Sequence, residues 1–323
     1  HSFPGITQLC FFFFAMLLIA AMVNAQGDSK LHAPVKMTKK GNSSMEITPN
    51  PGNSVVLNDS KATWDVLFTF DASDAANPGI ETDGTNFYTT TWSEDTITRY
   101  DMDGSNPVEF TIAGVSNIRD MAYDGTYFYG SDASMNLYQM DLANETLIST
   151  ITVTCTGVTG VRHIAYDTTL DGGNGGFWVG NWNELGAISM TGAELVAATS
   201  TEIESCYGSA YDNWTDPSNP CLWLFQQPTG VEAVFYQFDI NTYAMTGTTH
   251  DAADVPGYIT ESISGGACTY EADGLFILAG SIQQDPNLVF GYELAVTAAG
   301  TAPDTVENLT VVSGADGAMT YTI

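Results

Sequence analysis

A short pattern of apolar and polar residues recurs along the chain, and each copy contains the same kind of turn. The turns read ETDGT, AYDGT, AYDTT, AYDNW and TYEADG, and their acidic residues are Asp83, Asp124, Asp167, Asp212 and Glu271. Asp-Gly and related sequences favour a tight bend between two antiparallel strands. We therefore predict one strand directly before each turn and a second strand directly after it.

Each turn is followed by a short apolar segment and then by a strand of alternating character. The apolar segments read NFYTTTW, YFYGSD, GFWVGNW, CLWLFQQ and LFILAGS. The alternating segments end at Met102, Leu142, Met190, Ile240 and Leu294. A fourth strand such as PVEFTIAG follows in at least three units and is weak after Ile240. Four strands per unit, at a period of about forty to fifty-five residues, are typical of β-propeller blades.

The five units predict an all-β fold, a five-bladed β-propeller over residues 63–299. The fifth unit has no clear fourth strand after Leu294, because AVTAAGTAPDT is interrupted by Ala, Gly and Pro. WDVLFTFDA (residues 64–72) precedes the first unit and resembles the fourth strand of the other units. We expect this N-terminal strand to complete the last blade, which would close the ring and remove an exposed sheet edge.

The N-terminal residues predict export. Residues 1–25 contain an uncharged apolar run that ends in Val23-Asn24-Ala25, and this pattern is typical of a signal peptide. A transmembrane anchor is the alternative, but the apolar run is short for a bilayer span. We expect a secreted or cell-surface protein without membrane insertion after signal cleavage. Residues 26–62 are rich in Lys, Ser and Pro and predict a flexible linker.

The charge excludes several classes of partner. The chain has 8 Lys and Arg against 38 Asp and Glu, with a formal net charge of −30. All its lysines lie before Ala62, and the cations of the predicted ring are Arg99, Arg119 and Arg162. An acidic surface repels phosphate, so nucleic acid and anionic membranes are not expected partners. Solubility in salty surroundings and divalent-cation binding both fit this composition.

The sequence does not decide whether the protein has a calcium site or disulfide bonds. Asp101 and Asp103 in DMDGSN have the alternating spacing of a calcium loop, but the same residues suit a strand-to-strand turn. We therefore predict no cofactor, with calcium at this loop as the alternative. The cysteines outside the predicted signal peptide are Cys155, Cys206, Cys221 and Cys268. They allow one or two disulfides, and free buried thiols fit equally well.

Two arginines share one position in the repeat. The entries to the first strands align Pro78, Arg119, Arg162, Tyr207 and Gly266. An arginine here pairs with a nearby carboxylate such as Asp120, or presents its donors to a carboxylate, a sulfate or a polar sugar. Asp120 follows Arg119, whereas His163 follows Arg162 and cannot neutralise it. Arg162 is therefore the better candidate for ligand contact.

The ends of the second strands add aromatic residues to the same region. Trp92 and Trp182 align with each other, and Gln227 occupies the version of this position in the fourth unit. Indole faces stack on sugar C–H groups while hydroxyls need donors and acceptors, so this pattern favours carbohydrate. Packing of both tryptophans between blades is the alternative. The predicted ligand-binding set is Arg119, Arg162, His163, Trp92, Trp182 and Gln227.

Motifs for catalysis are scarce. The chain has no G-x-S-x-G, no H-E-x-x-H and no Gly-rich phosphate loop. The main prediction is a monomeric binding or adhesion propeller that recognises a glycan or an extracellular protein through its funnel face. The alternative is a carbohydrate-active hydrolase or lyase that uses Asp120, Glu184 and Glu81 with His163. A purely structural spacer is a third interpretation.

The blade repeats resemble the YVTN-like propellers of exported bacterial proteins. In addition, APDTVENLTVVSGADGAMTYTI (residues 302–323) resembles the opening two strands of a fibronectin type III domain, with a Pro lead-in and an N-L-T-V first strand. The resemblance implies that residues 300–323 are the start of such a domain, which these residues alone cannot complete. Together with the predicted signal peptide, this arrangement is similar to multidomain surface proteins of Bacteroidetes.

Overall fold

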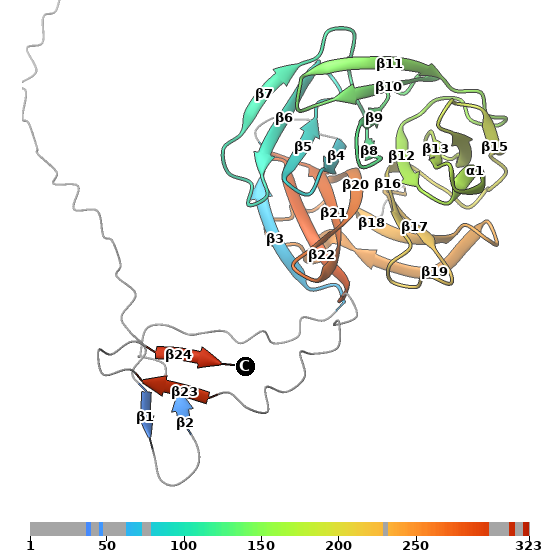
Figure 1. Cartoon of the computed structure of the whole chain (residues 1–323). Helices are drawn as coiled ribbons and strands as arrows, with labels where there is room; N and C mark the ends of the chain where they lie inside the picture. Colours follow the sequence, from blue (N-terminus) through green and yellow to red (C-terminus); the bar gives the residue numbers. More distant parts are fainter. Residues whose placement is uncertain are drawn as a thin grey trace, which may run out of the picture. The chain divides into compact units, whose positions relative to one another are not determined.

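The computed structural model describes residues 37–39, 45–47, 63–72, 79–228, 232–296, 310–313 and 319–322. The chain divides into two units, residues 1–59 and 60–323. In the first unit, β1 (Met37–Lys39) pairs antiparallel with β2 (Met45–Ile47). In the second unit, five four-stranded antiparallel sheets form a ring (Figure 1). Elsewhere in this unit, β23 (Thr310–Ser313) pairs with β24 (Met319–Thr322).

Several predictions fall on residues outside this range. The predicted signal peptide, residues 1–25, lies outside the described residues, and so does most of the predicted linker, residues 26–62. Strands β1 and β2 belong to that predicted linker. Strands β23 and β24 belong to residues 300–323, whose assignment to a fibronectin type III domain stays a prediction.

The five sheets are the five blades of a β-propeller, as the repeats predict. In the first blade the strands follow the order β4 (Gly79–Thr82), β5 (Asn86–Thr90), β6 (Thr96–Asp101) and β7 (Val108–Thr111). The second blade contains β8 (Met121–Tyr123), β9 (Phe128–Gly130), β10 (Asn136–Asp141) and β11 (Thr146–Thr152). The third contains β12 (His163–Asp167), β13 (Gly176–Gly180), β14 (Gly186–Ser189) and β15 (Glu194–Val196).

The last two blades have the longest strands. The fourth blade contains β16 (Cys206–Asp212), β17 (Cys221–Gln226), β18 (Val234–Asp239) and β19 (Ala244–Asp251). The fifth contains β20 (Ile263–Ala272), β21 (Leu275–Gln283), β22 (Leu288–Val296) and β3 (Val66–Asp71). Strand β3 pairs antiparallel with β22, with Asp71 opposite Leu288 and Val66 opposite Tyr292. Figure 1 shows the blue β3 beside the orange β22.

The fourth strand of the fourth blade is stronger than the sequence pattern indicated. Strand β19 is eight residues long, although the segment after Ile240 shows no clear alternation. Most of its side chains are exposed or half-buried. An outer strand of this kind needs backbone pairing with β18 but little apolar burial, so its sequence carries a weak signal.

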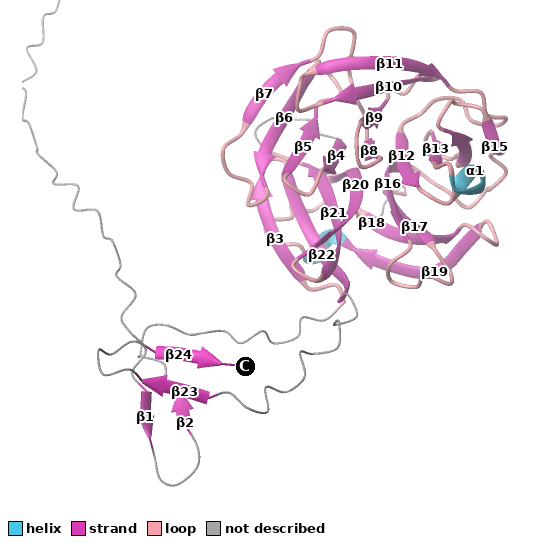
Figure 2. Ribbon diagram, in the orientation of Figure 1, coloured by secondary structure: helices cyan, strands magenta, loops and turns pink. Residues whose placement is uncertain are grey.

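Helical structure is scarce in the described part of the chain (Figure 2). It consists of the single turn α1 (Leu170–Gly173) and the 3₁₀ turn η1 (Ala252–Asp254). Among the described residues, no helix is long and apolar enough to cross a membrane.

The core lies between neighbouring blades. Phe225 and Phe235 of the fourth blade stack at 4.1 Å between ring centroids, and both contact Phe290 of the fifth blade. A single four-stranded sheet cannot bury both faces, so each blade depends on its neighbours for burial of its apolar surface. Small side chains occupy the crowded axis: Ala122, Ala165 and Ala210 are all buried.

The four cysteines in the described residues are all free and buried, so the disulfide alternative is wrong for this structure. Cys206 and Cys221 show the physical reason. They lie on neighbouring strands of one blade but at opposite ends of the pairing, where Cys206 faces Gln226 and Cys221 faces Asp212. Their separation along the strands prevents a bond between the two sulfur atoms.

The repeated aspartate holds its own turn and the second strand together. In Asp124, Oδ1 accepts the backbone N–H groups of Thr126 and Tyr127, and Oδ2 accepts the hydroxyl of Tyr129. The aspartate at the equivalent position of three other blades also accepts a hydrogen bond from an aromatic side chain of the second strand. These pairs are Asp83 with Tyr88, Asp167 with Trp178, and Asp212 with Trp223.

Candidate functional site

Two cavities lie at opposite ends of the five innermost strands, β4, β8, β12, β16 and β20. One is lined by residues that enter these strands and by the ends of second strands. The other is lined by the carboxyl ends of the innermost strands and by the turns that follow them. We call the first the arginine pocket and the second the turn-end cavity.

The arginine pocket has a volume of about 360 Å³. It is lined by Trp92, Arg119, Arg162, Trp182, Tyr207, Ile263 and Gln283. The structure therefore brings together four of the six residues that the sequence predicted as ligand-binding. The remaining two, His163 and Gln227, are not among the residues that line it.

Equivalent backbone positions place the two arginines in the same way. Arg119 precedes β8, and its N–H donates to Ser131 O; Arg162 precedes β12, and its N–H donates to Gly180 O. The Cζ atom of Arg162 lies 3.6 Å from the centroid of the Trp182 ring. That of Arg119 lies 5.1 Å from the centroid of Trp92. Arg162 thus packs over the tryptophan of its own blade and Arg119 over the tryptophan of the preceding blade, and both contacts are favourable cation–π arrangements.

Neither guanidinium group is paired with a carboxylate in a salt bridge among the described residues. Both buried Nε atoms also have no hydrogen-bond partner there. Burial lowers the pKa of Arg162 to about 10, and the positive charge of Arg119 contributes to this shift. Burial likewise lowers the pKa of Arg119, and the negative charge of Asp132 partly opposes this shift. Two partly desolvated like charges in one pocket attract an anion strongly.

The two tryptophans pack against the arginines and are partly exposed. Trp92 and Trp182 are 40% and 39% exposed, so they do not pack fully between blades. Arg162 covers one face of Trp182, and Tyr207 contacts the same indole edge-on at 5.0 Å between centroids. The indoles thus position the cations, and their remaining exposed surface is open to a ligand.

Asp120 fills the axis between the two cavities. It is 1% exposed, and its Oδ2 accepts the backbone N–H groups of Ile164 and Ser209 from the next two blades. Its Oδ1 has no hydrogen-bond partner among the described residues. A Cβ atom built on Gly266 would lie 2.5 Å from that oxygen, so the fifth blade needs glycine there. Asp120 therefore links blades and does not neutralise Arg119.

His163 and Glu184 are likewise occupied by structural contacts. His163 is fully buried, and its Nε2 lies 3.0 Å from Glu184 O while Nδ1 lies 3.3 Å from Ser209 Oγ. A carbonyl oxygen can only accept, so Nε2 carries the proton. Burial lowers the pKa of His163 to about 4. The side chain of Glu184 accepts hydrogen bonds from the backbone and hydroxyl of Thr159.

The remaining predicted residues lie elsewhere. Gln227 donates its Nε2 to Ser262 O. Asp103 Oδ1 accepts the N–H of Ser105, and Asp101 Oδ2 accepts the side-chain amide of Asn106. Within the described ranges, no group of three or more His, Cys, Asp or Glu side chains is arranged to hold a metal ion. Calcium at Asp101 and Asp103 stays an alternative from the sequence.

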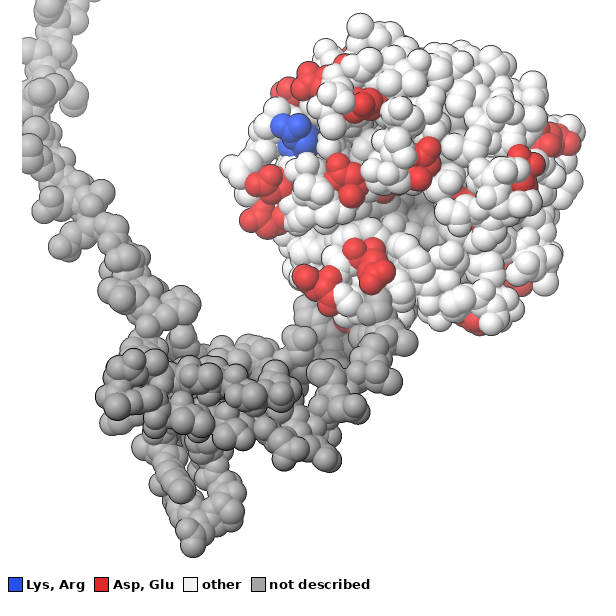
Figure 3. All heavy atoms as spheres, viewed as in Figure 1, with Lys and Arg blue, Asp and Glu red and all other residues white. Residues whose placement is uncertain are grey.

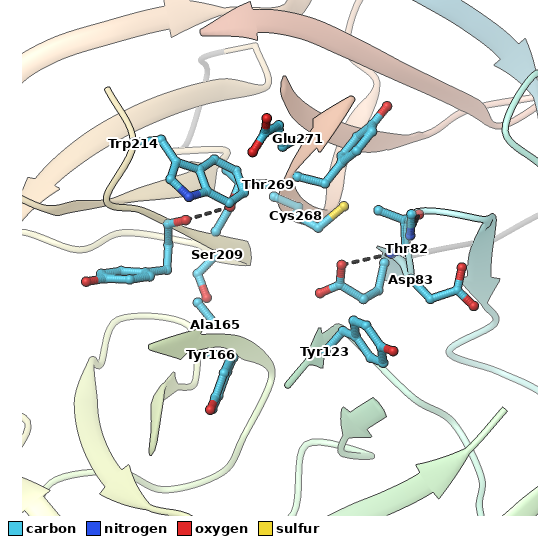
Figure 4. A pocket seen from close by; sticks show the side chains of 16 residues that line it. Thr82, Asp83, Tyr123, Ala165, Tyr166, Ser209, Trp214, Cys268, Thr269 and Glu271 are labelled. Atoms are coloured by element: carbon cyan, nitrogen blue, oxygen red, sulfur yellow. Dashed lines mark hydrogen bonds between the residues drawn. The ribbon is translucent and has the colours of Figure 1, made fainter. Parts of the chain in front are cut away.

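The turn-end cavity has a volume of about 290 Å³. Its lining includes Glu81, one of the predicted catalytic carboxyl groups. Figure 4 shows this cavity with Thr82, Tyr123, Cys268 and Trp214 around it, and a dashed line marks the 2.8 Å hydrogen bond from Thr82 N to Glu81 Oε1. Burial raises the pKa of Glu81 to about 8, although the Thr82 N–H partly offsets that rise.

Three residues of the arginine pocket escaped the sequence-based prediction. Tyr207 shares the repeat position of Arg119 and Arg162, so the alignment itself was a usable signal. Gln283 is the last residue of the second strand of the fifth blade. Trp92 and Trp182 lie just after the second strands of their own blades, so the positions are similar. Ile263 begins β20 and is 40% exposed, and nothing in the repeat pattern marks it.

No protein-family model and no curated protein sequence matches the chain. Among solved structures, it is similar to Myxococcus xanthus glutaminyl cyclase, with 15% identity and a TM-score of 0.53 over 72% of this chain and 97% of that one. It also matches Kuenenia stuttgartiensis hydrazine synthase, with 15% identity and a TM-score of 0.39 over 66% of this chain. The chain spans 58% of the hydrazine synthase chain. The first similarity supports the five-bladed propeller fold and nothing finer.

Proposed function

We propose that this protein is an exported binding propeller that recognises an anionic group of a glycan or extracellular partner in the arginine pocket. The observation that carries this proposal is the pair Arg119 and Arg162. In a chain with a net charge of −30, both guanidiniums share one pocket, and neither forms a salt bridge with a carboxylate of the described residues. A carboxylate or sulfate would accept their free donors and relieve their mutual repulsion.

The surroundings of the arginines favour a ligand with both charged and apolar parts. Exposed surface of Trp92, Trp182 and Ile263 borders the two cations. Tyr207 and Gln283 supply a hydroxyl and an amide, which can pair with ligand hydroxyls. An acidic sugar fits this combination, since its ring presents C–H faces as well as hydroxyls and a carboxylate or sulfate.

The hydrolase or lyase alternative is less well supported. It would need paired carboxyl groups facing one cavity. Of the predicted residues, Glu81 opens to the turn-end cavity, whereas Asp120 is buried in the axis and Glu184 is held by Thr159.

Segments outside the ring extend the proposal to the whole chain. We interpret residues 1–25 as a signal peptide and residues 300–323 as the start of a fibronectin type III domain. In this interpretation β3 closes the ring, and the propeller is one module of a YVTN-like exported protein.

A glycan array of acidic and neutral oligosaccharides tests the proposal. The wild-type protein should retain glycans that carry a carboxylate or a sulfate. Arg162→Ala should weaken their binding by about 1–3 kcal/mol, the range for a lost charge-assisted hydrogen bond, with little change in thermal stability. Arg99→Ala is the matched control, because Arg99 lies on β6 outside the pocket. Equal binding by wild type and Arg162→Ala would refute the proposal.

A further inference from the structure

The tyrosine of the repeated Tyr-Asp turn lines the turn-end cavity. Four innermost strands place a tyrosine directly before the acidic residue of the turn, and the first blade has Thr82 at this position. These tyrosines are Tyr123, Tyr166, Tyr211 and Tyr270, and all four line the cavity together with Trp214. The ring symmetry of the fold therefore gathers aromatic side chains from four blades at one end of the axis.

The same cavity contains acidic groups and no basic ones. Glu81, Asp83 and Glu271 line it, and no lysine or arginine is among the described residues that do so. Glu81 is only 8% exposed and forms no salt bridge within the described part of the chain. On the face shown in Figure 3, acidic side chains surround a central hollow, and cationic side chains are visible at one place.

We propose that the turn-end cavity is a second binding site, for a small organic cation of the alkylammonium class. Aromatic faces attract such cations through their quadrupole, and the Glu81 carboxylate would supply the opposite charge. The cavity volume of about 290 Å³ suits a compact ligand. The site differs from the arginine pocket in location and in the sign of its charge, so it does not depend on the function proposed above.

Binding should release a proton from Glu81. The groups that face this carboxyl are Asp83 on its own turn, Tyr123 from β8, Cys268 from β20 and Asp120 at the axis. None of them carries a positive charge, so the carboxyl holds its proton until a cation arrives. Affinity for a permanently charged ligand should therefore increase as the pH rises from 6 to 9.

Tetramethylammonium is a suitable probe, because its charge does not change with pH, and tert-butanol is its neutral counterpart of similar shape. Calorimetric titrations in 150 mM NaCl should show saturable binding of tetramethylammonium and roughly tenfold weaker binding of tert-butanol or none. The methyl proton resonance of the bound cation should shift upfield from ring currents. In buffers of different ionisation enthalpy, the heat should reveal proton release at neutral pH.

Variants separate this site from general attraction to an acidic surface. Glu81→Gln should weaken tetramethylammonium binding at least roughly tenfold, whereas Glu109→Gln removes the same charge from exposed strand β7 and should have no effect. Trp214→Leu should weaken binding and reduce the ring-current shift. This second variant tests the proposal even if Glu81→Gln does not fold. Arg162→Ala should bind tetramethylammonium normally, so failure of the arginine pocket would not affect this result.

Three results would overturn the proposal. One is the absence of saturable tetramethylammonium binding to the wild type. Another is equal affinity for tert-butanol, which would make the cavity merely apolar. The third is an affinity that Glu81→Gln and Trp214→Leu, both folded, leave unchanged.

Discussion

At the scale of single residues, the repeated Tyr-Asp pair has two separate tasks. The aspartate satisfies turn N–H groups and the polar atom of a second-strand aromatic residue, as Asp167 does with Trp178. The tyrosine beside it lines the turn-end cavity in four blades. One short motif thus stabilises the blade and shapes the surface at the axis, which explains why the chain repeats it.

The two kinds of aspartate contact should respond differently to an isosteric change. In Asp167→Asn, an NH2 group would replace the carboxylate oxygen that accepts from Trp178 Nε1–H. Because the NH2 group and the indole N–H can both only donate, the buried indole N–H would lose its partner. In Asp83→Asn, the Tyr88 hydroxyl can rotate and accept from the amide. We expect Asp167→Asn to lower the free energy of unfolding by about 1–3 kcal/mol and Asp83→Asn by less than about 1 kcal/mol. Urea titrations would measure both, and equal losses would contradict the assignment.

Glu81 should make stability dependent on pH. Burial raises the pKa of Glu81 to about 8, so the folded chain holds this proton more tightly than the unfolded chain, where it is lost near a pH of about 4.3. Below that pH both states are protonated and the group has no effect. Between the two pKa values, Glu81 ionises in the unfolded chain but stays protonated in the folded chain. Ionisation therefore stabilises only the unfolded chain, and the free energy of unfolding falls as the pH rises towards 8.

Glu81→Gln removes this titration and should therefore gain stability relative to wild type as the pH rises from 5 to 8. A shift of one pKa unit corresponds to about 1.4 kcal/mol, so we expect a relative gain of at least about 1 kcal/mol at pH 8. Thermal melts of wild type, Glu81→Gln and the exposed control Glu109→Gln across this range would measure it. Parallel curves for all three would show that Glu81 titrates normally.

At the scale of elements, β3 precedes the first blade in the chain but forms the outer strand of the fifth blade. It pairs with β22, and its aromatic side chains also reach the first blade. Phe68 lies 5.3 Å from Phe87 and Phe70 lies 5.3 Å from Tyr100 between ring centroids. One short strand therefore contributes backbone hydrogen bonds to one blade and apolar packing to the next.

Removal of β3 should leave the edge of β22 unpaired and the face of the first blade uncovered. We expect a chain that begins at residue 73 to associate or aggregate, because an exposed strand edge pairs with other copies. Size-exclusion chromatography with light scattering would measure this. A chain that begins at residue 60 and keeps β3 is the matched control and should be monomeric. A monomeric, cooperatively melting protein without β3 would show that this strand is dispensable.

At the scale of the whole molecule, the axis separates two chemically opposite cavities. The entry end holds two guanidiniums, and the turn end holds carboxyls and aromatic rings. Asp120 and His163 lie buried between them and hydrogen-bond to neighbouring blades. A propeller whose axis is filled in this way presents two separate cavities, each of which can be tested as a binding site independently of the other.

The sequence by itself determined the number of blades, the position of the turns and the shared location of Arg119, Arg162, Trp92 and Trp182. Repeats make these features readable, because equivalent positions in a closed ring must lie at the same end of the axis. Only the tertiary structure shows which of the predicted site residues are occupied by hydrogen bonds to other parts of the ring. Asp120 reaches Ile164 and Ser209 across two blade boundaries, and Glu184 reaches Thr159. Such contacts depend on side-chain direction and packing between blades, which a pattern along one strand does not encode.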